Sequence, residues 1–364
     1  MCNNTNLIAQ MADEPAAMSE GEGAFFQKML DIADHASAAL MISVGHRTGL
    51  WETIKQRPMS SIELAAAAGL DERYVREWLG AMASAGIVEL DRESRRYSLP
   101  PVHAAFLGRD AAKGNMAGMT QFIAVMGSVE SRIVDCFRNG GGVPYAEFDR
   151  FHEVMAEESA QTTVGGLEDH ILPLVPGLRE QLEAGIDVVD IGCGRGAAMI
   201  RLAGLFPNSR FTGYDLCDDA IDFARADAAA RGLANLRFEA RDVTGLEGEA
   251  YDLVFTFDAV HDQAHPAVVL ENIRRILKPG GVYLMQDIDA ATDVADNVGR
   301  PLATFTYTIS CMHCMTVSLA QGGDGLGAAW GEELALAMLR DAGFAEVQTH
   351  RLPHDIVNIY YLCR

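Results

Sequence analysis

The spacing of apolar residues divides the chain into two parts of different character. Up to about residue 180, apolar side chains recur every three or four positions, which is the period of an amphipathic helix. From residue 187 onward, short apolar runs alternate with helical patterns, as they do in a parallel, doubly wound α/β sheet. The pattern therefore predicts a helical N-terminal part and an α/β C-terminal part.

Apolar runs in the C-terminal part predict a sheet of seven strands. The first strands are expected at Val188–Ile191, Arg210–Tyr214, Leu236–Ala240, Leu253–Phe257 and Val282–Gln286. The helices are expected at Ala197–Phe206, Asp218–Arg231, Pro266–Leu277 and Trp330–Ala342. The last two runs, Ala345–His350 and Ile356–Cys363, are separated only by a short turn, which favours an antiparallel hairpin at the end of the sheet.

The pattern in the N-terminal part predicts one or two helices over residues 24–57 and a winged helix over residues 60–100. Its pattern consists of a capping-box start, a second helix and a hairpin, at Ser60–Glu63, Glu72–Ala85, Ile87–Leu90 and Arg96–Leu99. The leading helix carries apolar residues along its length, and we expect it to pack against a second subunit in a homodimer.

These patterns suggest four consecutive segments. We predict a flexible leader at residues 1–23, a winged-helix and dimerisation domain at 24–110, a helical linker and substrate-pocket segment at 111–180, and a catalytic α/β domain at 181–364. Within the last segment, residues 287–329 are more than a strand-to-helix connection needs. We interpret them as an insertion over the active site.

Methionine and aromatic residues gather in the helical segment at Met116, Met119, Phe122 and Met126. They either line a substrate pocket or fill the helical core. The core interpretation is favoured because methionine fills gaps in any core. His152 is interpreted as structural unless a pocket surrounds it.

Charge narrows the range of partners. The net charge of the chain is -22, which opposes nucleic acid and anionic membrane surfaces, because both attract lysine and arginine. The winged-helix region holds equal numbers of acidic and basic residues, and its second helix opens with Asp71 and Glu72. A winged-helix domain that binds DNA presents a basic face to it. We therefore interpret this region as a dimerisation and lid module that binds no nucleic acid.

The cell compartment follows from the termini and the cysteines. No apolar run approaches the roughly 20 residues of a membrane span, and residues 1–23 lack the apolar core of a signal peptide. The seven cysteines are odd in number and scattered, which favours free thiols over a disulfide framework. We expect a cytoplasmic protein that crosses no membrane.

A glycine-rich turn follows the first predicted strand of the C-terminal part. Gly192, Gly194 and Ala197 satisfy the dinucleotide fingerprint, with Asp215 at the distance of a ribose-binding acid. Asp190, however, would repel a pyrophosphate and suits a cationic ligand without phosphates. The alternative is that Asp190 only caps the turn.

The run Asp190-x-Gly192-x-Gly194-x-Gly196 resembles the first motif of class I S-adenosylmethionine-dependent methyltransferases. The resemblance continues in order through Asp215, Asp242, Phe257-Asp258 and Leu277-Lys-Pro-Gly-Gly281, and the N-terminal part resembles the winged-helix attachment of bacterial small-molecule methyltransferases. It implies a Rossmann-like sheet and S-adenosylmethionine as cosubstrate. The expected cofactor-binding residues are Asp190, Gly192, Gly194, Gly196, Asp215, Leu216, Asp242, Val243, Phe257 and Asp258.

The resemblance also assigns roles around the cofactor. Asp215 would accept from the ribose hydroxyls and Asp242 from the adenine amino group, while Val243 packs against the ring. The loop after the fourth strand would face the methyl group, and His261 is its candidate base because imidazole titrates near neutral pH. Asp262 or Asp258 would orient the imidazole. The alternative is that His261 only packs against the cofactor or caps the next helix.

The insertion contains Cys311-x-His313-Cys314. A structural zinc site needs four ligands in spaced pairs, and no second pair is evident, so we expect no metal. Thiols that hold a soft metalloid or a thiol substrate are an alternative. Buried, inert cysteines in an apolar helix are the favoured interpretation.

We therefore predict a methyltransferase that acts on a small-molecule acceptor. One alternative is a winged-helix transcriptional regulator with a ligand-sensing α/β domain, which a basic second helix would favour. Another is a methyltransferase specialised for thiol or metalloid acceptors. A nicotinamide oxidoreductase is opposed by Asp190 and by the terminal hairpin.

Overall fold

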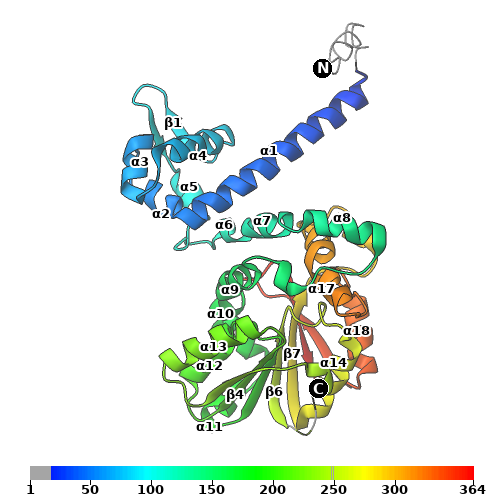
Figure 1. Cartoon of the computed structure of the whole chain (residues 1–364). Helices are drawn as coiled ribbons and strands as arrows, with labels where there is room; N and C mark the ends of the chain where they lie inside the picture. The colour runs from blue at the N-terminus through cyan, green and yellow to red at the C-terminus, as the bar shows by residue number, and fades with distance from the viewer. Residues whose placement is uncertain (1–17, 247, 249) are drawn as a thin grey trace. The chain divides into compact units, whose positions relative to one another are not determined.

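The computed structural model describes residues 18–246, 248 and 250–364, and the chain divides into two units between Thr120 and Gln121 (Figure 1). Most of the predicted leader, residues 1–17, lies outside the described residues. The first helix, α1 (Glu20–Thr48), already includes the last four residues of that leader. It begins there because Ser19 and Glu22 form a capping box that satisfies the first backbone N–H groups.

The N-terminal unit has the predicted winged-helix pattern. Its elements are α1, α2 (Leu50–Ile54), α3 (Ser61–Ala68), α4 (Glu72–Ser84), β1 (Glu89–Asp91), β2 (Arg96–Ser98), α5 (Pro101–Ala104) and α6 (Met116–Met119). Trp51 and Trp78 meet edge to face at its centre, with ring centroids 4.8 Å apart. Their indole N–H groups donate to the carbonyls of Ile42 and Met41, which fixes the end of α1 in this core.

Most of α1 is not covered by the rest of the N-terminal unit. Its buried residues are Ser43, Gly45 and His46, all at its C-terminal end. The large apolar residues left exposed on it are Phe25, Phe26, Met29, Leu30, Ile32, Leu40 and Val44. A helix that is apolar along its length normally packs against another surface.

The C-terminal unit is built on one seven-stranded sheet with strand order β5-β4-β3-β6-β7-β9-β8. The strands are β3 (Asp187–Ile191), β4 (Arg210–Asp215), β5 (Leu236–Ala240), β6 (Tyr251–Phe257), β7 (Leu277–Ile288), β8 (Val347–His350) and β9 (Asn358–Cys363). The first five are parallel, and β9 is antiparallel to both β7 and β8. The predicted sheet and its terminal hairpin are confirmed.

Helices cover both faces of the sheet and give it two apolar cores (Figure 1). One core contains side chains of α11 (Leu178–Ala184), α12 (Ala197–Leu205) and α13 (Asp218–Ala230). The other contains side chains of α14 (Pro266–Ile276) and α18 (Glu332–Asp341). This layering leaves the carboxyl ends of the parallel strands free to carry a site.

Above the sheet lie a helical segment and the predicted insertion. The segment comprises α7 (Gln121–Gly127), α8 (Glu130–Asn139), η2 (Tyr145–Glu147), α9 (Phe151–Gln161), α10 (Thr163–Gly166), the π-helix η3 (Leu167–Ile171) and η4 (Leu172–Leu174). The insertion comprises α15 (Val294–Asn297), α16 (Ala303–Ile309), the π-helix η6 (Ser310–Cys314) and α17 (Met315–Ala320).

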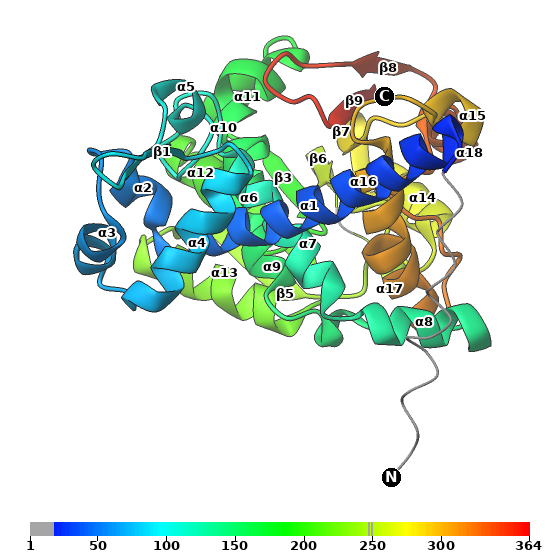
Figure 2. The ribbon, with the colours of Figure 1, turned by 90° about the horizontal axis from the view of Figure 1, so that it is seen from above.

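The helical segment and the insertion pack against each other. Phe122, Met126 and Val317 are buried in one shared core, with Phe305 packed against it. In both views α16 and α17 lie beside α8 (Figures 1 and 2). Phe122 and Met126 are therefore core residues, as favoured above. No helix in the described part of the chain is long and apolar enough to span a bilayer.

Candidate functional site

Two of the three glycines in the turn after β3 lie close against neighbouring side chains, and the third faces open space. The three glycines, Gly192, Gly194 and Gly196, all have positive φ, at 74°, 52° and 73°. A Cβ on Gly192 would lie 2.4 Å from the side chain of Ala259, and one on Gly196 would lie 2.3 Å from the ring of Phe238. A Cβ on Gly194 would meet no described atom within 4 Å. The turn therefore exposes its backbone at Gly194, where a ligand can approach.

Asp190 lies beneath this turn with an unsatisfied carboxyl group. Its side chain is 2% exposed, and its Oδ1 atom is buried without a hydrogen-bond partner among the described residues. Burial and the nearby Asp215 raise the pKa of Asp190 to about 8. An unpartnered buried carboxyl costs free energy that a cationic donor would recover.

Asp215, at the end of β4, holds the turn in place. Its two carboxylate oxygens accept from the backbone N–H groups of Gly194 at 2.8 Å and Cys217 at 2.9 Å. The Asp215 side chain thus ties the ends of β3 and β4 together. Each oxygen keeps a second lone pair for a ligand hydroxyl.

A pocket opens at the carboxyl ends of β3, β4 and β6. It is lined by Tyr145, Phe151, His152, Met155, Gly192, Gly194, Asp215, Leu216, Cys217, Phe257, Asp258, Ala259, Asp262, Gln263 and Gln321. Seven of the predicted site residues meet there, namely Gly192, Gly194, Asp215, Leu216, Phe257, Asp258 and Asp262. Gln321 comes from the segment predicted as an insertion over the site.

One wall of this pocket lies in the 111–180 segment, whose individual site residues the sequence did not indicate. It consists of Tyr145, Phe151, His152 and Met155, which lie on η2 and α9. The available signal was a run of aromatic residues directly after Gly140–Gly142, where the helical pattern breaks. His152, interpreted as structural unless a pocket surrounds it, does line one, and its Nδ1 lies 3.2 Å from the Asp219 carboxylate.

Asp242 and Val243 do not line the pocket. Asp242 caps the short helix η5 (Val243–Gly245), where its carboxylate accepts from the N–H and hydroxyl of Thr244 at 2.9 and 2.7 Å. These hydrogen bonds hold the pKa of Asp242 below its usual value. Val243 is 6% exposed in the apolar core. Their contacts with adenine stay predictions.

Phe257 ends β6, and Asp258 then turns the chain with a φ of 51°. Such a left-handed conformation is strained for a residue other than glycine, and strain of this kind gathers at functional sites. The carboxyl of Asp258 accepts from the Gln286 amide at 2.9 Å, and its other oxygen is buried without a partner in the described structure. Burial and Asp287 raise the pKa of Asp258 well above its usual value.

His261 is oriented by a carboxylate that the sequence did not indicate. Its Nδ1 lies 2.7 Å from Asp287 on β7, and neither Asp258 nor Asp262 makes this contact. Our expectation that one of those two orients the ring was wrong, because the parallel pairing of β6 and β7 brings Asp287 beneath the loop. The same Asp287 oxygen accepts from the indole N–H of Trp330 at 2.9 Å.

The His261 ring is enclosed. It is 3% exposed and does not line the pocket. The thiol of Cys314 lies against it. Burial disfavours the imidazolium, but Asp287 and Cys314 outweigh it and raise the pKa of His261 well above its usual value. The imidazolium is therefore the form that this environment stabilises.

Asp262 faces the pocket and is bound by Tyr145. The phenol hydroxyl of Tyr145 donates to the Asp262 carboxylate. Burial raises the pKa of Asp262, His261 and Tyr145 oppose that rise, and the resulting pKa is about 6. The Tyr145 ring is nearly parallel to that of His152, at 6.0 Å between centroids.

The π-helical turn η6 directs neighbouring side chains to different surroundings. His313 is 1% exposed, stacks on Phe151 with centroids 3.5 Å apart, and has no partner for either ring nitrogen among the described residues. Cys314 is buried against His261, whereas the half-buried Cys311 lines a groove between α8 and α16. Burial raises the pKa of both thiols. No group of three potential metal ligands occurs among the described residues.

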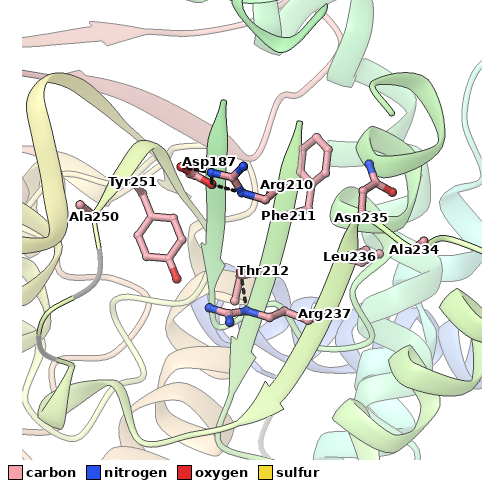
Figure 3. Close-up of a pocket in the computed structure, with 10 residues that line it drawn as sticks. All are labelled: Asp187, Arg210, Phe211, Thr212, Ala234, Asn235, Leu236, Arg237, Ala250 and Tyr251. Atoms are coloured by element: carbon pink, nitrogen blue, oxygen red, sulfur yellow. Dashed lines mark hydrogen bonds and ion pairs between the residues drawn. The ribbon is translucent and has the colours of Figure 1, made fainter. Parts of the chain in front are cut away.

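A second cavity lies at the opposite edge of the sheet, where the strands begin (Figure 3). Its arginines are bound by neighbouring side chains: Arg210 forms two hydrogen bonds with Asp187, at 2.7 and 2.8 Å, and Arg237 donates to the Thr212 hydroxyl at 3.1 Å. Sites of parallel sheets lie at the carboxyl ends of the strands. We therefore assign the candidate site to the pocket around Gly194 and Asp262.

Comparison with known proteins agrees with this architecture. A family model described as an Rv2258c-like winged HTH domain matches residues 36–109, and one described as a methyltransferase domain matches residues 182–342. The chain is 30% identical over 109 residues to the fatty-acid O-methyltransferase of Mycolicibacterium smegmatis, a match that covers 30% of this chain and 39% of that protein. It is 35% identical over 99 residues to the trans-aconitate 2-methyltransferase of Deinococcus radiodurans, covering 27% and 36%. The chain thus spans less than half the length of these relatives.

Solved structures match over nearly the whole chain. A putative O-methyltransferase from Nostoc punctiforme aligns with a TM-score of 0.70 at 20% identity, covering 96% of this chain and 100% of that one. The mitomycin 7-O-methyltransferase MmcR aligns with a TM-score of 0.67 at 19% identity, covering 94% and 99%. Human N-acetylserotonin methyltransferase, in complex with S-adenosylmethionine, aligns with a TM-score of 0.65 at 16% identity, covering 96% and 99%. At these identities the likeness shows the fold.

Proposed function

Since the chain belongs to the class I methyltransferases that carry an N-terminal winged-helix domain, we propose that it transfers a methyl group from S-adenosylmethionine to a small-molecule acceptor. The observation that carries the proposal is the buried Oδ1 of Asp190, which has no hydrogen-bond partner among the described residues, beneath a glycine turn that is open at Gly194. A buried acid at this position suits a cationic, phosphate-free ligand and opposes a pyrophosphate.

The residues present fit S-adenosylmethionine. Asp190 would meet its ammonium group, Gly194 would give it room, and Asp215 would accept from its ribose hydroxyls. Asp242 and Val243 are proposed to contact the adenine, beside Leu216 and Phe257. When bound, the cosubstrate supplies a methyl group that is already activated by the positive sulfur.

His261 is proposed as the group that takes the proton of the acceptor. A base that becomes positively charged benefits from a carboxylate on its far nitrogen, and Asp287 occupies that position at 2.7 Å. A cation bound in the adjacent pocket would lower the pKa of His261 and so favour the neutral imidazole. Cys314 would have to release the ring before an acceptor could reach it.

The alternatives find less support. On α4, Arg73 and Arg76 pair with Glu77 and Glu72, so the helix that would read DNA has no free basic face in its described side chains. An acceptor site for thiols or metalloids would need its cysteines together, but Cys311 and Cys314 lie in different surroundings.

The protein is also proposed to be a cytoplasmic homodimer. The seven exposed apolar side chains of α1 form the kind of surface that a second copy would cover. An enclosing partner would explain why a helix of 29 residues is packed only at its C-terminal end.

The test of the methyl-transfer proposal is calorimetric titration of the full chain with S-adenosylmethionine, followed by a screen of hydroxyl, amine, thiol and metalloid acceptors for release of S-adenosylhomocysteine. Binding and turnover are expected with one acceptor class. Binding without turnover of any acceptor would favour a ligand sensor instead.

A further inference from the structure

We propose that Asp262, held by Tyr145, recognises the positive charge on the cofactor sulfur, so that the pocket binds S-adenosylmethionine more tightly than S-adenosylhomocysteine. This inference rests on the proposed function. It concerns discrimination between the methyl donor and its demethylated product, which methyl transfer does not itself require. The two ligands share their adenosine and amino-acid groups, so contacts to those groups alone would not distinguish them.

Each of the other acids of the site has a contact or an expected partner of its own. Asp190 lies beneath the glycine turn, where it would meet the ammonium group. Both oxygens of Asp215 accept from backbone N–H groups. Asp258 accepts from Gln286 at 2.9 Å, and burial and Asp287 raise its pKa well above its usual value. Asp262 lines the pocket, accepts from the Tyr145 hydroxyl and, with a pKa of about 6, is mostly ionised at pH 7.5.

Tyr145 makes this acid specific for a soft cation. Its hydroxyl donates to Asp262, and its ring lines the same pocket beside the parallel ring of His152. The faces of aromatic rings attract positive charge, most strongly when that charge is weakly hydrated. A carboxylate and an aromatic ring on one wall suit a sulfonium better than a compact ammonium ion.

Methyl transfer turns the sulfonium into a neutral thioether. The carboxylate of Asp262 then loses its positively charged partner, whereas every other contact of the shared ligand groups stays the same. The Coulomb attraction of two charges in a partly buried site is large enough to change affinity by about tenfold or more. The pocket would thus hold the methyl donor and release the spent product.

The experiment is calorimetric titration of the full chain with each ligand separately, at pH 7.5, for the native protein and three variants. Asp262→Asn removes the charge and keeps the shape of the side chain. Tyr145→Phe keeps the ring and removes the hydroxyl. Asp222→Asn is the matched control, because its side chain is 74% exposed on α13 and pairs with Arg225.

We expect the native protein and Asp222→Asn to prefer S-adenosylmethionine by about tenfold or more. In Asp262→Asn the two affinities should come within about threefold, through loss of S-adenosylmethionine binding alone, and Tyr145→Phe should lie between. Retained S-adenosylhomocysteine binding shows that the variants are folded.

Three results would overturn the inference. If Asp262→Asn keeps the native preference, or weakens both ligands equally, the charge on the sulfur is recognised elsewhere. If the native protein binds both ligands equally, there is no recognition to explain. A native protein that binds neither ligand would instead overturn the proposed function, so the two failures are distinguishable.

Discussion

His261 and Asp287 form a buried pair, with 2.7 Å between the imidazole Nδ1 and the carboxylate Oδ1. The pair joins the loop after β6 to the end of β7, and the indole of Trp330 binds the same oxygen. Three separate segments of the C-terminal unit thus meet at the Asp287 carboxylate. This arrangement gives His261 a fixed ring orientation and stabilises its protonated form.

If His261 is the base, its loss should affect turnover far more than cofactor binding. We expect His261→Ala to lower kcat by about 10²–10⁴-fold, the usual contribution of acid–base catalysis, with little change in the Kd of S-adenosylmethionine. Steady-state kinetics and calorimetry measure the two quantities. His265→Ala is the control on the same loop, since that side chain is 48% exposed. Unchanged kcat in His261→Ala would leave the residue a structural role only.

Replacing Asp287 should shift the pH profile. The proposed base acts when neutral, so activity should rise as pH increases through the pKa of His261. Asp287 raises that pKa and burial lowers it, so Asp287→Asn should move the rising limb to lower pH. Profiles of kcat over pH 5–10 would show the shift. If the rise of kcat with pH occurs at the same pH in both proteins, it reflects the titration of a group other than His261.

The same pair predicts how stability depends on pH. The folded-state pKa of His261 is raised, so its contribution to stability is fully present below the unfolded pKa and is lost as pH rises through the folded value. The stability difference between the native protein and Asp287→Asn should therefore shrink at alkaline pH. Thermal melts of both proteins from pH 6 upward measure this difference, and a constant gap would contradict the assignment.

We expect Asp190 to destabilise the ligand-free folded protein and to strengthen the binding of S-adenosylmethionine. Its folded-state pKa is raised to about 8, so the folded protein binds more protons than the unfolded chain between about pH 4 and 8, and stability falls as pH rises in that range. We expect Asp190→Asn to raise the melting temperature of the ligand-free protein at pH 8. The same variant should weaken S-adenosylmethionine binding by about 1–3 kcal/mol. A variant that melts lower and binds normally would show that Asp190 only caps the turn.

The exposed face of α1 predicts the oligomeric state. Light scattering after gel filtration should give the mass of a dimer, and charges placed on that face, as in Phe26→Asp with Leu30→Asp, should give a monomer. Ile62→Asp is the control, because Ile62 is an apolar residue on α3 that is 70% exposed. A monomeric native protein, or a control that dissociates as well, would contradict the proposed interface.

The fold was predictable because its signals are local. Apolar runs of strand length, a glycine turn after Asp190 and a terminal pair of strands each stand in a short stretch of sequence, and all three appear in the structure. Which of the three glycines leaves its backbone open, Gly194, is known only from the structure.

The site contacts that the sequence did not predict join residues that lie far apart in the chain. Asp287 is 26 positions from His261, and only the register of β6 and β7 brings the two together. Tyr145 is 117 positions from Asp262. The π-helical turn at His313 and Cys314 leaves no periodic signal, because a single irregular turn inside a helix does not alter the apolar pattern around it.

The most direct test of the central claim is a paired titration of the native protein and Asp190→Asn with S-adenosylmethionine and with a nicotinamide dinucleotide. The account predicts that the native protein binds only the sulfonium compound, and that Asp190→Asn binds it about tenfold or more weakly. Binding of the dinucleotide, with no binding of S-adenosylmethionine, would contradict it.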